Sequence, residues 1–381
     1  MSAPKPHSSI LKIEPYVGGK SSLPGVAKTI KLSSNESALG PSPRAVAALR
    51  AAAETMHRYP DGGSTDLRQA IAKRFGLDAD RIVCGTGSDE LIALLCRAYS
   101  GPGDEVLYSQ YGFVMYPIAA LSAGAAPVTA PEKTFQADAL SAGATPVVAP
   151  AKGYWADVDA LLAHATPRTK LCFIANPNNP TGTYLSAAEM RRLRDGLPAG
   201  CLLVIDAAYS EYVTRNDYSA GAELVDGRDD VVMLRTFSKL FAMGGMRIGW
   251  AYCPPAIVDV LHRIRGVFNV SGPAQAAAIA ALEDLAHQDQ SRAHNDMWLP
   301  WFVQELRALG LEVVPSVANF VLIGFAKDGP KTAAAANAFL NKRGIIPRAV
   351  GNYGLPNHLR ITIGLESELR AVVAALQDFL K

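Results

Sequence analysis

Short apolar segments alternate with helical patterns from residue 81 to residue 252, and this alternation constrains the fold more than any other feature. Apolar runs of four to seven residues are typical of strands that are buried on both faces of a sheet. The expected strands are 81–84, 105–108, 169–175, 202–206, 231–235 and 248–252, and the helices between them are 88–99, 113–122, 157–164 and 186–196. The sequence therefore predicts an α/β domain with a mostly parallel sheet covered by helices.

The pattern changes after residue 270. Helices are expected at 273–286 and 287–309, and a smaller α+β domain then follows, with elements at 311–314, 319–324, 331–342, 345–348, 358–363 and 365–380. Its spare sheet edge is expected to accept the segment near 30–34. We predict an N-terminal arm (1–30), a small discontinuous domain (31–48 and 270–381) and a large domain (49–269).

Two helix starts are marked between the arm and the sheet. Ser42 followed by Pro43 is a good N-cap and first-turn pair for a helix through about Glu54. A loop at 58–63 then precedes a helix over 65–75 that is expected to be capped near Ser64.

The composition limits the class of protein. Across 381 residues, 49% are hydrophobic and 19% charged, and the net charge of +2 gives no reason to invoke nucleic acid or an anionic membrane. No apolar run has the length of a membrane span, and the first residues lack the apolar segment of a signal peptide. We expect a cytoplasmic enzyme whose five scattered cysteines are reduced and form neither disulfides nor a metal site.

One internal repeat is clear. Residues 121–138 and 140–157 match at 12 of 18 positions. Two copies are too few to build a solenoid, so we interpret the repeat as a local tandem duplication. One copy is expected to supply a strand of the sheet and the other an additional surface segment.

Lys239 lies in the largely apolar stretch 234–250, where a lysine is an unusual residue. Burying an ammonium group is costly, so this lysine either points outward or has a lowered pKa. A lysine of lowered pKa is a nucleophile, and the lysine that forms a Schiff base with pyridoxal phosphate (PLP) is a common example. The hydroxyls of Thr236 and Ser238 and the charge of Arg247 suit the phosphate of that cofactor. An exposed lysine in a polar turn would be the simpler interpretation if the other strand ends did not carry matching groups.

Ligands of parallel sheets bind beyond the carboxyl ends of the strands, and two further strand ends carry polar residues. Asp206 ends an apolar strand, where a buried carboxylate needs a partner such as a protonated pyridine nitrogen. Tyr209 follows it and is placed to donate to the ring oxygen. Asn179 lies in a rigid Asn-Pro loop after 169–175, and we expect its bond to Pro180 to be cis. An aspartate that merely caps a turn is the alternative for Asp206.

Other candidates are weaker individually. The motif GTGSDE at 85–90 opens a helix, and its free backbone N–H groups would form an anion site, although an ordinary glycine turn is at least as good an explanation. Phe113 is placed to stack on a ring, but an aromatic residue there is more often part of the core. Arg348 and Arg360 lie in apolar strand contexts, and two such arginines indicate an anionic substrate.

The motifs are LSSNESALGPSP (32–43), RYPD (58–61), GTGSDE (85–90), ANPNNPTGT (175–183), DAAYSEY (206–212), RTFSKLFAMGGMRIG (235–249) and YGLPNHLRITIG (353–364). With these motifs the chain resembles the fold-type I PLP-dependent aminotransferases over essentially its whole length. Within them it resembles most the histidinol-phosphate aminotransferase subfamily. The duplication is absent from the family pattern, which puts the local fold between 121 and 157 in doubt.

The resemblance implies roles for individual residues. It makes Lys239 the Schiff-base lysine and proton shuttle, pairs Asp206 with the pyridine nitrogen and places Tyr209 and Asn179 at the ring oxygen. The phosphate is assigned to the backbone amides of Ser88 and Asp89, to Thr236, Ser238 and Arg247, and to Tyr59 from the other subunit of a homodimer. Arg360 is implied to bind the α-carboxylate of glutamate. Tyr16 of the partner's arm and Arg348 are implied to lie near the distal anionic group of the substrate.

The implied reaction transfers the amino group of L-glutamate to imidazole acetol phosphate and yields L-histidinol phosphate and 2-oxoglutarate. Two alternatives remain open, an aromatic amino acid aminotransferase and a PLP-dependent decarboxylase of a phosphorylated amino acid, because their motifs are similar. A PLP-binding transcription regulator is disfavoured, since an arm of some 30 residues without a helix-turn-helix pattern leaves no room for a DNA-binding module.

Overall fold

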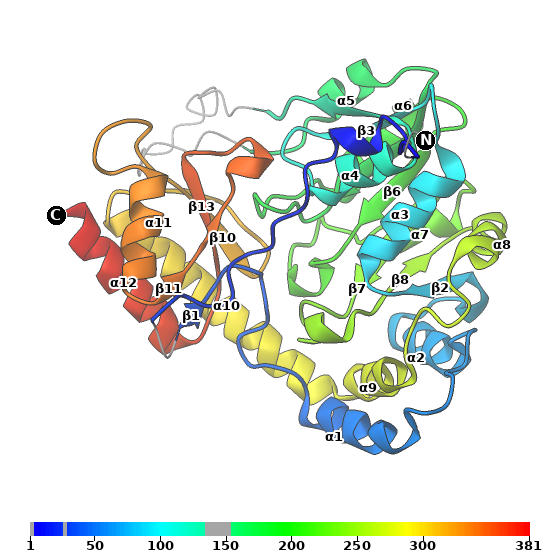
Figure 1. Ribbon diagram of the computed structural model, residues 1–381, viewed down its shortest axis with the longest axis horizontal. Helices are drawn as coiled ribbons and strands as arrows, with labels where there is room; N and C mark the ends of the chain where they lie inside the picture. The colour runs from blue at the N-terminus through cyan, green and yellow to red at the C-terminus, as the bar shows by residue number, and fades with distance from the viewer. Residues whose placement is uncertain (1–3, 26–28, 134–153) are drawn as a thin grey trace.

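The computed structural model describes residues 4–25, 29–133 and 154–381. Figure 1 shows a larger unit, built around one sheet, beside a smaller unit that contains the C-terminus. The long helix α10 (Leu285–Ala308) runs from one unit to the other. Among the described residues, no helix combines the length and the apolar character needed to cross a membrane.

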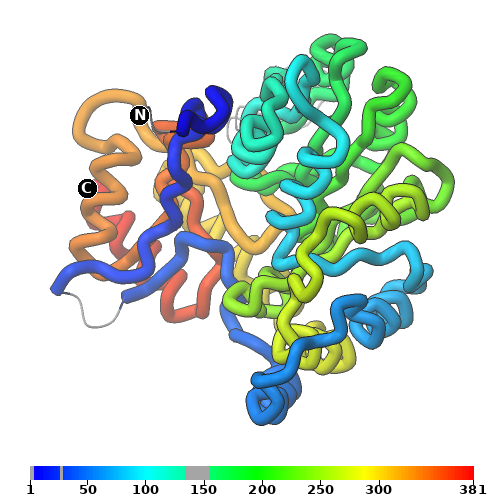
Figure 2. Tube along the Cα trace, turned by 45° about the vertical axis from the view of Figure 1, so that its right-hand side comes forward, coloured from blue at the N-terminus to red at the C-terminus, as the bar shows by residue number. Residues whose placement is uncertain are grey.

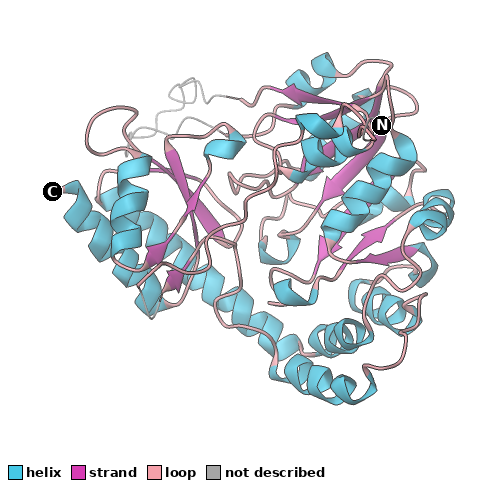
Figure 3. Ribbon diagram, viewed as in Figure 1, coloured by secondary structure: helices cyan, strands magenta, loops and turns pink. Residues whose placement is uncertain are grey.

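The large unit contains a seven-stranded sheet, whose strands are drawn in magenta in Figure 3. In spatial order its strands are β2 (Ile82–Gly85), β8 (Gly249–Tyr252), β7 (Val231–Thr236), β6 (Leu202–Asp206), β5 (Thr169–Ala175), β3 (Glu105–Ser109) and β4 (Ala126–Ala130). Only β8 runs antiparallel to its neighbours in this sheet. The predicted mostly parallel α/β sheet is confirmed.

Both faces of this sheet are buried, because successive side chains of a strand point to opposite faces. Val204 packs on one side with the helices α3 (Ser88–Tyr99), α4 (Met115–Ser122) and α8 (Pro255–Ile264). Its neighbours Leu203 and Ile205 pack on the other side with α2 (Thr65–Phe75), α5 (Val158–His164), α6 (Ala187–Gly196), α7 (Ala222–Asp226) and α9 (Gly272–Glu283). The consecutive apolar residues of each strand thus serve two cores.

The small unit has an antiparallel sheet of four strands, in the order β12 (Arg348–Ala349), β13 (His358–Thr362), β10 (Phe320–Gly324) and β9 (Glu312–Val314). Its core is closed by α10, α11 (Ala333–Lys342) and α12 (Glu366–Leu380). The N-terminal strand β1 (Ile30–Lys31) pairs in parallel with β11 (Ile345–Ile346), as predicted for the segment near 30–34. The predicted single strand 345–348 is divided into β11 and β12 at Pro347, which has no N–H to donate to a ladder.

The N-terminal segment passes between the two units. Figure 2 shows it, in dark blue, running down beside the small unit. A short 3-10 helix (Ile10–Lys12) lies against α4 of the large unit, whereas β1 belongs to the small unit. The segment after β1 therefore reaches the space between the units, where the site lies.

The helices that follow begin as predicted, with one difference in capping. Ser42 caps α1 (Pro43–Ala52) by accepting from the N–H groups of Arg44 and Ala45 at 3.1 and 3.3 Å. At α2, Ser64 makes no capping hydrogen bond. Asp61 accepts from the N–H of Thr65 at 2.7 Å in its place.

The division into domains stays a prediction. The boundary placed at residue 270 falls just before α9, which packs against α1 and α2 and contributes buried alanines to the core of the large sheet. Of the duplicated segment, the first copy forms the end of α4 and strand β4. The second copy lies mostly outside the described residues, which resume at Tyr154.

Candidate active site

A cavity opens at the carboxyl ends of β2, β5, β6 and β7, where the sequence predicted a ligand site. Its walls also include the N-terminus of α3 and part of the segment 33–36, which we call the strap. The predicted residues that line it are Ser88, Asp89, Phe113, Asn179, Asp206, Tyr209, Thr236, Ser238, Lys239 and Arg247. These residues are spread over 160 positions of the sequence and are brought together by the order of the strands.

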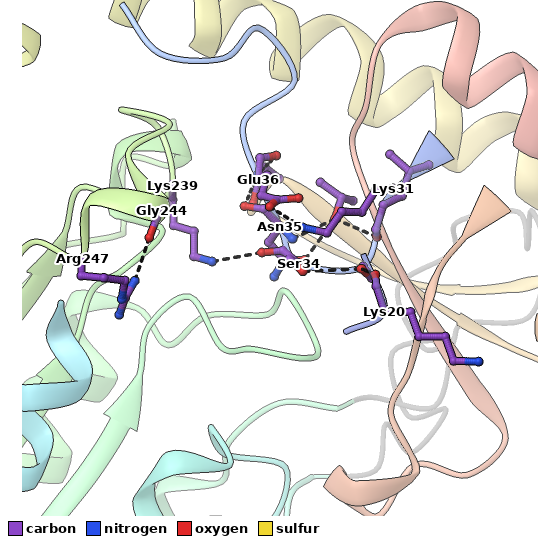
Figure 4. A network of polar contacts seen from close by, with 12 residues as sticks. Lys20, Lys31, Ser34, Asn35, Glu36, Lys239, Gly244 and Arg247 are labelled. Atoms are coloured by element: carbon purple, nitrogen blue, oxygen red, sulfur yellow. Dashed lines mark hydrogen bonds and ion pairs between the residues drawn. The ribbon is translucent and has the colours of Figure 1, made fainter. Parts of the chain in front are cut away.

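Lys239 reaches into the cavity from the loop after β7. Its Nζ donates to the backbone oxygen of Ser34 in the strap, 3.3 Å away (Figure 4). It lies 5.3 Å from the centre of the Tyr209 ring. Burial, assisted by the charge of Arg360, lowers the pKa of Lys239 from 10.5 to about 8. A lysine with this pKa is partly unprotonated near pH 8 and can act as a nucleophile and a proton carrier.

Asp206 is buried at the end of β6, with 4% of its surface exposed. Burial raises the pKa of its carboxyl from 3.8 to about 6. One oxygen, Oδ2, accepts from the hydroxyl of Tyr116 at 3.0 Å, whereas Oδ1 has no hydrogen-bond partner among the described residues. A buried carboxylate oxygen without a partner is costly, so this atom is available for a donor on a ligand.

Tyr209 lies in the turn that follows β6, three residues after Asp206, and is 4% exposed. Its hydroxyl oxygen accepts from Nδ2 of Asn35 at 2.8 Å, and its ring packs edge-on against Phe320. Burial raises the pKa of Tyr209 to about 12. The hydroxyl therefore keeps its hydrogen at any physiological pH and can donate it toward the cavity.

Asn179 is held by an arginine. NH1 of Arg360 donates to Oδ1 of Asn179 at 2.5 Å, and NH2 donates to the backbone oxygen of Ser33 at 2.8 Å. The Nε of Arg360 has no partner among the described residues, although this side chain is 5% exposed. The bond between Asn179 and Pro180 is cis, as predicted, and the bond between Asn176 and Pro177 is also cis.

The end of the cavity near α3 is suited to an anion. The N-cap residue of α3, Gly87, has no side chain to cap the first turn, and Ser88 and Asp89 of that turn line the cavity with the helix dipole behind them. The hydroxyls of Thr236 and Ser238 lie 3.0 Å apart beside this turn. These donors come from two strand ends and were both predicted.

Arg247 completes the anion site. Its guanidinium pairs with the carboxylate of Asp89 at 3.2 Å. It also donates to the backbone oxygen of Gly244 at 3.0 Å (Figure 4). Gly87 has a φ of +81°, and a Cβ at that position would overlap the guanidinium. Glycine is therefore required at position 87 for both the backbone conformation and the close approach of Arg247.

Four predicted residues lie outside the cavity wall. Tyr59 is 83% exposed and stacks on Phe268 with ring centres 4.6 Å apart. Arg348 lies in a neighbouring groove with Tyr16, and its guanidinium carbon is 5.8 Å from the centre of that ring. The contact between Tyr16 and Arg348 is intramolecular in this single chain, whereas the resemblance implied a tyrosine from the partner. Arg360 lies behind Asn179, as described above.

The residues present fit PLP. The unpartnered Oδ1 of Asp206 matches a protonated ring nitrogen, and the uncapped turn of α3 with Arg247 matches a phosphate. Lys239 lies between them with a lowered pKa. Phe113 lines the same cavity and meets Tyr116 edge-on at 5.9 Å, which leaves a ring face for stacking.

Sequence reasoning missed two residues that hold the site together. Tyr116 carries the hydrogen bond to Asp206 and is completely buried, stacked on Phe173. Asn35 carries the hydrogen bond to Tyr209 and adopts a left-handed conformation with φ of 55°. Asn35 belongs to one of the motifs that carried the family resemblance, but its contact with a residue 174 positions away left no local signal.

Comparisons with known proteins identify the family of this chain. The family model "Aminotransferase class I and II" matches residues 27–376. The chain is 59% identical to the histidinol-phosphate aminotransferase of Paramagnetospirillum magneticum, with 100% of this chain and 99% of that one covered. It is 57% identical to the enzyme of the same name from Rhodospirillum centenum, with both chains fully covered. A solved structure, histidinol-phosphate aminotransferase from Sinorhizobium meliloti in complex with pyridoxal-5'-phosphate, matches with a TM-score of 0.84 and 28% identity, covering 100% of this chain and 98% of that chain. The chain therefore belongs to the class I and II aminotransferase family.

Proposed function

We propose that this chain is a PLP-dependent aminotransferase that converts L-glutamate and imidazole acetol phosphate into 2-oxoglutarate and L-histidinol phosphate. The observation that carries the proposal is Lys239, a buried lysine with a pKa lowered to about 8 in a cavity that also holds an unpartnered aspartate oxygen and an anion site. The names of full-length relatives at 50 to 59% identity support the substrate.

When bound, PLP supplies an electron sink that stabilises the negative charge left when an amino acid loses its α-proton. Lys239 would hold the cofactor in the resting enzyme and then carry that proton from one carbon to another. Asp206 would keep the proton on the ring nitrogen, and Tyr209 would donate to the ring oxygen. Asn179 would hold the same oxygen from the other side.

The remaining residues would bind and orient. The amides near Ser88 and Asp89, with Thr236, Ser238 and Arg247, would hold the cofactor phosphate, and Phe113 would stack on the ring. Arg360 would bind the α-carboxylate of glutamate, because its Nε is free of protein partners and its NH groups are fixed by Asn179 and Ser33.

The chemical group at the far end of the substrate, a phosphate or a neutral ring, distinguishes the proposed activity from an aromatic aminotransferase. The groove beside the cavity contains Arg348, whose side chain is 8% exposed, and Tyr16. A buried guanidinium favours a phosphate over the neutral ring of phenylalanine. The same residues would also bind the phosphate of a phosphorylated amino acid. Only the reaction products therefore distinguish the proposed aminotransferase from the alternative decarboxylase.

We also propose a homodimer with shared sites. Tyr59 is mostly exposed beside a group of exposed apolar side chains, Met56, Val267 and Phe268. Tyr59 stacks on Phe268, and exposed apolar side chains that contact one another are typical of an interface. A mixture of Lys239→Ala and Tyr59→Ala protomers would contain one complete site in each mixed dimer, so activity would reappear on mixing. A dimer without such recovery would refute the sharing of sites.

A cytoplasmic location remains part of the proposal. All five cysteines are buried and unpaired, which agrees with a reducing compartment.

An absorbance experiment tests the function. The purified holoenzyme is expected to show a band above 400 nm that disappears with glutamate and returns faster with imidazole acetol phosphate than with phenylpyruvate. Faster return with phenylpyruvate would indicate an aromatic aminotransferase, and release of carbon dioxide would indicate a decarboxylase. No band after PLP is added would refute the proposal.

A further inference from the structure

We propose that Asn35 is a positioning residue that orients the hydroxyl hydrogen of Tyr209 toward the ring oxygen of the cofactor. This inference rests on the proposed function. Asn35 does not line the cavity and would act only through Tyr209.

Asn35 is fixed before any ligand binds. Its side chain is buried, with 1% exposed, and its Nδ2 lies 2.8 Å from the hydroxyl oxygen of Tyr209. Its backbone N–H donates to Oγ1 of Thr362 at 2.9 Å, and its backbone oxygen accepts from Nδ2 of Asn319 at 3.1 Å. The left-handed conformation of Asn35 is one that asparagine tolerates better than most residues.

The direction of this hydrogen bond decides what Tyr209 can do. A tyrosine hydroxyl has one hydrogen to donate and lone pairs that accept. When the amide N–H of Asn35 occupies a lone pair, the hydrogen of Tyr209 remains available for a second partner. A partner that only accepts, such as a carboxylate, would take this hydrogen and turn it away from the cavity.

Charged groups surround Tyr209, and they must be separated from the effect of Asn35. Lys239 lies over its ring at 5.3 Å, and Arg360, Asp206 and Asp89 also act on the hydroxyl through their charges. Among the described residues, the side chain of Asn35 makes no hydrogen bond to any of these charged groups. Lys239 and Arg360 instead contact the strap through the backbone oxygens of Ser34 and Ser33, which a substitution at position 35 retains.

The strap connects both units at this point. Asn35 is anchored to β13 through Thr362 and to the residue before β10 through Asn319, and both belong to the small unit. Tyr209 belongs to the large unit. The orientation of the Tyr209 hydroxyl would therefore depend on the small unit, through the contacts that hold Asn35 in place.

The test compares Asn35→Asp with Asn35→Gly in the holoenzyme. Aspartate has nearly the same shape but accepts the hydrogen of Tyr209, whereas glycine adopts the left-handed backbone without cost and offers no partner. The readout is the pH midpoint of the visible band, which reports the proton shared between the Lys239 nitrogen and the ring oxygen. Loss of the Tyr209 donor leaves more negative charge on that oxygen, so the midpoint should rise.

We expect Asn35→Asp to raise the midpoint by about one pH unit, and Asn35→Gly to raise it by less, because nothing then competes for the hydrogen. Tyr209→Phe should raise it at least as much as Asn35→Asp. Equal midpoints in the wild type and Asn35→Gly, or equal shifts in the two Asn35 variants, would overturn the proposal.

A double variant excludes the new charge as the cause. If Asn35 acts through Tyr209, adding Asn35→Asp to Tyr209→Phe should produce no further shift. A shift that persists in the Tyr209→Phe background would mean that the aspartate acts on Lys239 directly, and the inference would fail. A wild-type protein without any visible band would instead refute the proposed function itself.

Discussion

Replacing Asp206 with asparagine should make the cofactor-free protein more stable while it removes activity. Burial raises the pKa of Asp206 from 3.8 to about 6, so the folded protein resists the charged form that the unfolded chain accepts freely. The difference of 2.2 units, at 1.36 kcal/mol per unit, corresponds to about 3 kcal/mol of unfolding free energy. Asparagine keeps an acceptor for the Tyr116 hydroxyl and carries no charge.

The sign of the effect fixes its pH dependence. A carboxyl with a raised pKa imposes no penalty below pH 3.8 and its full penalty above about pH 6. The stabilisation by Asp206→Asn should therefore be about 3 kcal/mol at pH 8 and about half of that at pH 5. Urea unfolding of the cofactor-free proteins, at equal protomer concentrations, measures both values.

Activity should change in the opposite direction. Asparagine cannot hold a proton on the ring nitrogen, so transamination should fall by about 10²- to 10⁴-fold. The matched control is Asp66→Asn, at an exposed position of α2, which should change the unfolding free energy by less than about 0.5 kcal/mol at either pH. Equal stabilisation by Asp206→Asn at pH 5 and pH 8, or a loss of stability at pH 8, would refute the argument from burial.

Three further outcomes are expected. Lys239→Ala should bind PLP without the band above 400 nm and should lose about 10³-fold or more in activity, measured by absorbance and by glutamate turnover. Tyr116→Phe should weaken PLP binding about 10-fold, measured by fluorescence titration, because Asp206 loses its hydrogen bond and holds its proton more tightly. Deletion of 134–152 removes one repeat length and only residues outside the described structure, so PLP binding should stay within about twofold. A larger loss would assign the duplication a role in the site.

Much of the fold follows from local patterns. The predicted strands 169–175 and 202–206 and the helix 88–99 agree with β5, β6 and α3 at every residue, because both faces of the sheet are buried and the apolar runs end sharply at polar loops. Predictions were least accurate where a single residue decided how a strand or a helix ends. Pro347 interrupts a ladder, and Asp61, rather than the nearer Ser64, caps a helix.

The candidate site, like the fold, contains some residues that the sequence could predict and others that it could not. Lys239 and Asp206 could be predicted because each lies at or just beyond the carboxyl end of a strand, and in a parallel sheet these ends share one edge whatever their distance in sequence. The strand order itself, in which β8 lies between β2 and β7, could not be obtained from the alternation alone.

No comparable rule predicts the residues that hold these site residues in position. Asn35 lies 174 positions from Tyr209, and Tyr116 lies 90 positions from Asp206. Each makes its contact through one polar atom of an otherwise buried side chain, and a buried Tyr or Asn in a sequence resembles any other core residue. Their effect is nevertheless specific, because a donor placed behind a catalytic group fixes the direction of its hydrogen or the charge on its oxygen. Polar groups of this kind become visible only when every buried donor and acceptor of the folded chain is assigned a partner.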